Sequence, residues 1–238
     1  MNRNRLYLLG AAAVAAIVVV GVVVAIASKG GSSATTSTVA PTTSSTSTSA
    51  QNGVDLLAGI PQKGEVLGRA SAPVTIQVFE DPQCPFCQEW NVGTLPTVVR
   101  DYVRTGQIKL VYRGIQIIGP NSEQGLRAIY AAGRQNRLWQ MADALYARQG
   151  SENSGWIDDA VIASAAKAAR VNVTKLSAAF LSAPVNAELK SAERAAVTYA
   201  VQGTPTFVVE HPPAQPTQLQ LSALDPSSFA AAVEPLLK

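Results

Sequence analysis

The stretch VTIQVFEDPQCPFC, residues 74–87, decides the fold of this chain of 238 residues. Its apolar first half predicts a strand from Val74 to Glu80. A helix should begin at Cys84 or Pro85, because proline fits the first helical turn, where its missing N–H is not needed. Cys84 and Cys87 are the only cysteines in the chain. They lie one helical turn apart, so a disulfide between them can close and reopen.

Two cysteines with this spacing can serve three purposes. A structural disulfide closing so short a loop would remove little chain entropy and add little stability. A zinc site needs four ligands, and His211 is the only histidine, so carboxylates or a second subunit would have to complete it. We favour the third purpose, electron exchange between dithiol and disulfide. We therefore expect neither a metal nor another cofactor.

The N-terminus predicts export. Leu6 to Ala27 is a run of 22 uncharged, mostly aliphatic residues that follows Arg3 and Arg5 and precedes Lys29. Such a run can span a bilayer, and the preceding arginines favour a cytoplasmic N-terminus. Residues 1–27 thus predict a single transmembrane anchor. The alternative is a signal peptide cleaved after Ala27, and under both interpretations the rest of the chain is extracytoplasmic.

Composition divides the remaining chain into two parts. Residues 28–53 are rich in Ser and Thr and predict a disordered linker. Residues 54–238 have the size of one domain. All 16 acidic residues and 16 of the 19 basic residues follow Asn52, so this domain is close to neutral. The domain has no stripe of basic residues that could bind nucleic acid, so we expect no nucleic-acid partner. We expect a monomer that contacts the membrane through its N-terminal helix.

The coarse secondary structure continues from the quoted stretch. Residues 54–68 predict an extra edge strand, and the helix after Cys84 should run to about Tyr102 with a kink at Pro96. The later predictions are a strand at 108–113, helices at 122–135, 137–149, 156–169 (capped by Ser154), 174–181 and 185–201, strands at 206–210 and 217–221, and a closing helix from Asp225. This order predicts an α/β fold with a mixed sheet, helices on both faces and an all-helical insertion at about 121–201.

A second motif, Gly203-Thr204-Pro205-Thr206, precedes the later apolar strand. A proline there marks a strand start or a special turn, because it cannot donate to the sheet. Together with the cysteine motif and the helical block between them, it resembles the DsbA-like branch of the thioredoxin superfamily. The resemblance covers about residues 71–238 and continues through 111–113, 131–135, 138–139 and 145–146. It implies a thioredoxin-like fold with an inserted helical subdomain.

The resemblance also implies roles for individual residues. Cys84 would be the exposed nucleophile and Cys87 the buried resolving thiol. Pro205 would be a cis-proline beside the disulfide, and Thr204 would offer backbone groups to an extended substrate. Pro85 and Phe86 would complete the substrate-binding surface. Independently, a helix N-terminus favours the thiolate of its cysteine.

The activity so implied is the introduction of disulfides into exported proteins that carry free cysteine pairs. A membrane partner that passes electrons to a quinone would reoxidise the cysteines. Two alternatives stay open: a reductase or isomerase of the same fold, and a non-catalytic peptide-binding module. Because Phe86 offers no hydrogen bond to the thiolate, we predict a milder oxidant than the form with histidine at this position.

Two acidic residues are candidates for a proton carrier beside the cysteines. Relatives often carry a buried acid six residues before the first cysteine, where this chain has Val78. Glu80 and Asp81 lie nearer to Cys84 and could relay a proton to or from Cys87. The alternative is that both belong to a solvated strand end.

Overall fold

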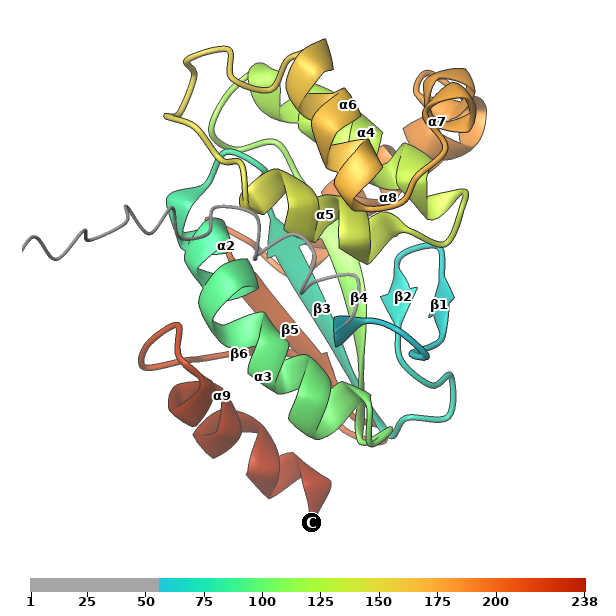
Figure 1. Cartoon of the computed structure of the whole chain (residues 1–238). Helices are drawn as coiled ribbons and strands as arrows, with labels where there is room; N and C mark the ends of the chain where they lie inside the picture. The colour runs from blue at the N-terminus through green and yellow to red at the C-terminus, as the bar shows by residue number, and fades with distance from the viewer. Residues whose placement is uncertain (1–55) are drawn as a thin grey trace, which may run out of the picture. The chain divides into compact units, whose positions relative to one another are not determined.

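The computed structural model describes residues 56–238 (Figure 1). The predicted anchor, residues 1–27, and the predicted linker, residues 28–53, lie outside the described residues. Within residues 56–238 no helix has both the length and the apolar character that a membrane crossing requires.

The sheet is built around β3 (Val74–Glu80) and β4 (Ile108–Gly114), which pair in parallel. On the other side of β3 lies the antiparallel strand β5 (Thr206–Glu210), followed by the edge strand β6 (Thr217–Leu219). The short strands β2 (Val66–Leu67) and β1 (Gln62–Lys63) extend the sheet beyond β4. The order is β1-β2-β4-β3-β5-β6, which confirms the predicted mixed sheet.

A continuous helical segment follows β3. It consists of α2 (Pro85–Glu89), the π-helical η1 (Trp90–Thr94), α3 (Leu95–Val98) and the π-helical η2 (Val99–Val103). The sequence predicted a kink at Pro96. The structure places the wider π-helical turns of η1 just before this residue, and such turns accommodate irregular backbone hydrogen bonding.

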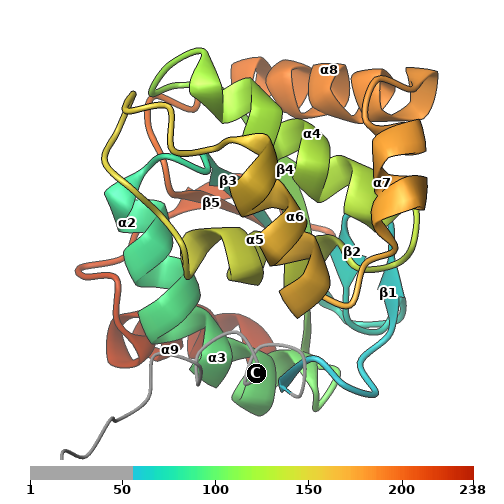
Figure 2. The same cartoon turned by 45° about the horizontal axis from the view of Figure 1, so that its top comes forward.

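The predicted helical insertion lies between β4 and β5 (Figures 1 and 2). Its helices gather at the end of the sheet where β3 ends, and α5 lies beside the segment that carries the cysteines. The insertion comprises α4 (Asn121–Gly133), α5 (Leu138–Tyr146), α6 (Asp159–Ala168), α7 (Val173–Ala179) and α8 (Ala183–Thr198). The chain closes with α9 (Pro226–Val233) and the 3₁₀ turn η3 (Glu234–Leu237).

The predicted cap of the helix that became α6 was wrong. Asp158 is the cap, because its Oδ1 accepts a hydrogen bond from the backbone N–H of Val161 at 2.8 Å. Ser154 instead donates to the carbonyl of Ser151 at 2.8 Å. A carboxylate competes well for the unpaired N–H groups of a first turn. The helix therefore begins three residues later than the sequence suggested.

One face of the sheet packs under the helical segment of the cysteines. Side chains alternate along a strand, so Val78 and Glu80 project from the same face. The ring of Trp90 lies 4.5 Å from that of Phe207 in β5 and 5.6 Å from that of Phe229 in α9, centroid to centroid. These buried aromatic contacts hold η1 against the sheet.

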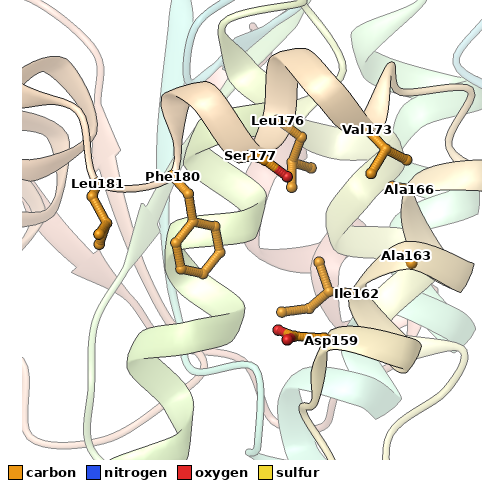
Figure 3. Close-up of a pocket in the computed structure, with 9 residues that line it drawn as sticks. All are labelled: Asp159, Ile162, Ala163, Ala166, Val173, Leu176, Ser177, Phe180 and Leu181. Carbon is orange, nitrogen blue, oxygen red and sulfur yellow. The ribbon is translucent and has the colours of Figure 1, made fainter.

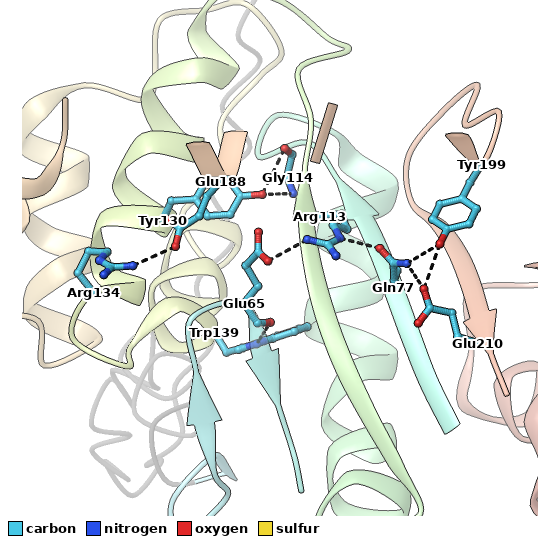
Figure 4. Close-up of polar contacts among 10 residues, drawn as sticks. All are labelled: Glu65, Gln77, Arg113, Gly114, Tyr130, Arg134, Trp139, Glu188, Tyr199 and Glu210. Atoms are coloured by element: carbon cyan, nitrogen blue, oxygen red, sulfur yellow. Dashed lines mark hydrogen bonds and ion pairs between the residues drawn. The ribbon is translucent and has the colours of Figure 1, made fainter. Parts of the chain in front are cut away.

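The opposite face carries a chain of polar contacts (Figure 4). Arg113 pairs with Glu65 at 2.8 Å and donates through Nε to Gln77 Oε1 at 2.6 Å. Gln77 in turn donates to Glu210, which also accepts from the Tyr199 hydroxyl at 3.1 Å. Arg113 therefore links strands of the sheet on the face away from α2.

Candidate active site

Cys84 occupies the N-cap position of α2. Its backbone is extended (φ −73°, ψ 121°), and its N–H donates to the Asp81 carbonyl at 3.0 Å. The side chain of Gln149 donates to the carbonyls of Pro82 and Cys84, at 2.8 and 3.0 Å. The loop before the helix is thus tied down on both sides. These hydrogen bonds hold the Cys84 sulfur at the N-terminus of α2, the positive end of the helix dipole.

The second motif meets Cys84 across 120 residues of sequence. The Cys84 sulfur lies 3.1 Å from the Thr204 carbonyl oxygen, to which the protonated thiol donates, and the Thr204–Pro205 peptide bond is cis. Both cysteines are buried, Cys84 with 3% and Cys87 with 0% of its surface exposed, so the structure does not match the expectation of an exposed Cys84, which is only the less buried of the two. The structure therefore brings together the two motifs that the sequence singled out.

The environment separates the two thiols in acidity. Hydrogen bonding from the Cys87 side chain lowers the pKa of Cys84 to about 6, helped by Thr204 and by backbone N–H groups of α2, against the effect of burial. Burial raises the pKa of Cys87 well above its usual value. At neutral pH the reduced pair therefore holds a thiolate at Cys84 and a thiol at Cys87.

Glu80 and Asp81 are fully buried, so the alternative of a solvated strand end is wrong. Burial raises the pKa of Glu80 to about 8, although the Asn91 side chain donates to its Oε2 at 3.0 Å and lowers it. The same Asn91 amide donates to the Cys87 carbonyl at 2.8 Å. Glu80 is thus a protonated carboxyl at neutral pH, held beside the helix turn of Cys87.

Asp81 has a different environment. Its Oδ1 accepts from the Gln83 N–H at 2.8 Å and the Ser122 hydroxyl at 2.6 Å. Its Oδ2 accepts from the N–H groups of Ile117 and Ile118 at 2.7 and 2.9 Å. Four donors occupy both oxygens. Asp81 therefore ties the loop after β4 and the start of α4 to the loop before Cys84.

The surface around Cys84 is apolar. Phe86 is 61% exposed and Pro85 is also exposed, while Thr204 and Pro205 are half-buried. Ile117, whose N–H binds Asp81, is 44% exposed. Exposed apolar side chains of this kind mark surfaces that contact other molecules.

The comparisons with known proteins agree with this geometry. The sequence profile of the family described as thioredoxin matches residues 62–224. The chain belongs to the thioredoxin family. With the cysteine pair at the start of α2 and the relatives described next, it is a DsbA-like thiol-disulfide oxidoreductase.

Two similar sequences in this family come from bacilli. The probable disulfide bond formation protein D of Bacillus cereus is 28% identical over 147 residues, 60% of this chain and 68% of the relative. The disulfide bond formation protein D of Bacillus subtilis is 26% identical over 125 residues, 51% of this chain and 56% of the relative. The structure of oxidised BdbD from Bacillus subtilis matches with a TM-score of 0.63 at 19% identity, over 75% of this chain and 97% of that chain, and shows the shared fold.

Three further residues contact the site, and the sequence analysis gave none of them a role, although it named Tyr146 among the positions that carry the resemblance: Asn91, Tyr146 and Gln149. Asn91 lies four residues after Cys87, so helical spacing could have placed it on the same helix face. Tyr146 and Gln149 come from α5 and the residues after it, and no local pattern links them to the cysteines. Within residues 56–238, no group of three or more His, Cys, Asp and Glu side chains is arranged to hold a metal ion.

A cavity of about 410 Å³ lies elsewhere, between α6 and α7 (Figure 3). Apolar side chains such as Ile162, Leu176 and Phe180 line it, with the Asp159 carboxyl at one side. It includes neither cysteine and neither residue of the Thr204–Pro205 bond. The thiol chemistry of this family member therefore does not use it.

Proposed function

We propose that this thioredoxin-family protein works as an oxidase that introduces disulfides into exported proteins. The observation that carries the proposal is the place of Cys84 at the N-cap of α2, beside Thr204 and one helical turn from Cys87, where the pKa of Cys84 is lowered to about 6 and that of Cys87 is raised. A stable thiolate is a good leaving group, so a disulfide that contains Cys84 passes readily to another dithiol. The reduced protein is then more stable than the oxidised protein, and this difference drives the oxidation of the substrate.

The reaction has two steps. A substrate thiolate attacks the Cys84 sulfur of the Cys84–Cys87 disulfide, which forms a mixed disulfide and releases Cys87 as a thiolate. The second substrate thiolate attacks the substrate sulfur of the mixed disulfide and expels Cys84 as a thiolate. The substrate has lost two electrons and gained a disulfide. Cys84 and Cys87 have gained those electrons, and the substrate's protons pass to Cys87 and to solvent.

Glu80 is our candidate for the proton donor to Cys87 in the first step. It is protonated at neutral pH, and Asn91 bonds both its carboxyl and the Cys87 carbonyl. Because the pKa of Cys87 is raised above that of Glu80, the newly formed Cys87 thiolate is the stronger base and takes the Glu80 proton. The four bonds that occupy the Asp81 carboxylate support a structural role for Asp81 instead.

Substrate binding is assigned to the surface around Cys84. Thr204 and Pro205 would contact an extended substrate segment, and the exposed Pro85 and Phe86 would contact its apolar side chains. The names of the bacillary relatives, disulfide bond formation protein D, support this substrate class. We further propose that this protein acts outside the cytoplasm and that a membrane partner passes electrons from its cysteines to a quinone. The apolar run from Leu6 to Ala27 would anchor the protein there.

The direction of electron flow is tested by equilibrating the Cys84–Cys87 pair with glutathione. We expect a potential well above the value of about −270 mV that is typical of a thioredoxin reductant. The protein should also oxidise a reduced, unfolded substrate with two cysteines, Cys84→Ser should lose this turnover, and Cys87→Ala should trap the mixed disulfide. A potential as low as that of thioredoxin would assign the protein to the reductases. Full function of Cys84→Ser would leave only the peptide-binding alternative.

A further inference from the structure

Glu80 faces polar side chains from several other elements. Val78 pairs with Tyr112 in β4, and Glu80 follows Val78 by two residues, so Glu80 and Tyr112 project from the same face of the sheet. Val78 also pairs with Phe207, whose ring contacts Trp90. Trp90 therefore lies over the same face as Glu80.

The helix of the cysteines supplies one side of this cluster. Cys87, Trp90 and Asn91 are spaced i, i+3 and i+4, which puts them on one helix face. Asn91 occupies only one carboxyl oxygen of Glu80, Oε2. The other oxygen, Oε1, is buried and has no hydrogen-bond partner within the described residues.

Helix α5 supplies the opposite side. Tyr146 lies at its last turn, and its backbone carbonyl accepts a bond from Gln88 Nε2 at 2.9 Å, which joins α5 to α2. The Tyr146 hydroxyl, the Tyr112 hydroxyl and Trp90 Nε1 are buried, and none has a partner within residues 56–238. Three buried donors without acceptors thus lie in the same cluster as a buried carboxyl oxygen of Glu80 that has no partner. Each buried polar group without a partner costs folding free energy, so a cluster of four such groups needs a functional explanation.

We propose that Tyr146, assisted by Tyr112 and Trp90, is a positioning residue that stabilises the ionised form of Glu80 while Glu80 lends its proton to Cys87. This inference rests on the proposed function. When Cys87 leaves the disulfide as a thiolate, it takes the Glu80 proton, and a carboxylate charge appears inside the protein. The Tyr146 O–H then donates a hydrogen bond to Oε1 of the ionised Glu80. This hydrogen bond is released when Glu80 is protonated again.

The acid–base properties of the cluster are consistent with this role. Burial dominates the raised pKa of Glu80, whereas Asn91, Tyr146 and Trp90 each lower it. Burial and the nearby Glu80 charge raise the pKa of Tyr146, so its hydroxyl keeps its proton and stays a donor. The titratable groups that face Glu80 are Cys84 and Cys87 from the start of the helix, Tyr112 from β4 and Tyr146 from α5.

The test compares Tyr146→Phe with Tyr130→Phe in the full chain. Tyr130 is equally buried, but its hydroxyl accepts a bond from the Gly114 N–H at 2.8 Å (Figure 4). Reduction of the Cys84–Cys87 disulfide by a small dithiol should slow about tenfold at pH 7 in Tyr146→Phe, the size expected for one hydrogen bond to a charge. The pH at which the infrared band of the protonated Glu80 carboxyl disappears should move upward. Tyr130→Phe should leave both properties unchanged.

Tyr146→Phe with the wild-type pH profile and the wild-type carboxyl titration would overturn the inference. Should Tyr146→Phe fail to fold by circular dichroism, Tyr112→Phe decides the question by the same two measurements, with changes in the same directions. The infrared titration does not depend on any protein substrate. Failure of the wild-type protein to oxidise a substrate would therefore reject the proposed function, whereas an unchanged titration would reject the role of Tyr146.

Discussion

Glu80 and Asp81 are adjacent in the sequence and equally buried, but their surroundings differ. The loop around Asp81 provides four donors for its two oxygens. The cluster around Glu80 provides one hydrogen bond and leaves an oxygen free. A fully bonded carboxylate holds structure together, and a poorly bonded one keeps its proton and can pass it on. The two adjacent acids therefore differ in hydrogen bonding and not in burial, and this difference is the basis of the roles that we propose for them.

Removal of the Asp81 carboxylate should have the largest effect. Asp81→Ala leaves four donors without their acceptor, two of them buried, so we expect a loss of about 3–5 kcal/mol in the free energy of unfolding, measured by urea denaturation. Asp158→Ala removes one bond, at the cap of α6, and should cost about 1 kcal/mol. Equal losses of stability in Asp81→Ala and Asp158→Ala would contradict the structural role that the four hydrogen bonds of Asp81 indicate.

Glu80→Gln should act through pH. The pKa of Glu80 is raised in the folded protein, so its favourable contribution is complete below the unfolded pKa and is lost as the pH rises to about 8. The variant should therefore gain stability over wild type between about pH 4.5 and pH 8, by up to about 1.4 kcal/mol per pH unit. The Cys84–Cys87 disulfide of the variant should also be reduced more slowly by a small dithiol, because the Gln amide cannot donate an acidic proton to the Cys87 thiolate.

The control for this pH effect is Glu152→Gln at an exposed position. Denaturation curves of both variants at several pH values separate the effect of the buried position from the effect of the Glu-to-Gln change itself. A constant difference between Glu80→Gln and wild type would show that Glu80 is ionised in the folded protein, and would remove the contrast with Asp81.

Phe86→His should have the smallest effect, on the exposed side of the same sulfur pair. A histidine at this position can donate a hydrogen bond to the Cys84 thiolate, which stabilises the reduced protein. We expect the reduction potential to rise by about 30 mV, the equivalent of one charged hydrogen bond. Equilibration with glutathione measures this change. A potential equal to or below that of wild type would contradict the sequence-based prediction of a mild oxidant.

The local elements of this fold were predictable because they depend on neighbouring residues. Val74–Glu80 and Thr206–Glu210 have the predicted strand bounds, and the helix begins at Pro85 as expected. Their apolar runs and prolines act within a few residues. The cap at Asp158 was missed because Ser154, Asp158 and Asp159 are all acceptable first-turn residues, and packing chose among them.

For the site, the sequence by itself determined the chemistry: two cysteines one helical turn apart, at a helix N-terminus that favours the thiolate. It also supplied both candidate acids. Only the tertiary structure decided how each acid is hydrogen-bonded, because Asp81 is bonded by Ile117, Ile118 and Ser122 and, within residues 56–238, Glu80 by Asn91 alone, all on other elements. Hydrogen-bond satisfaction is a property of the packed neighbourhood, and no local pattern in residues 74–87 encodes it.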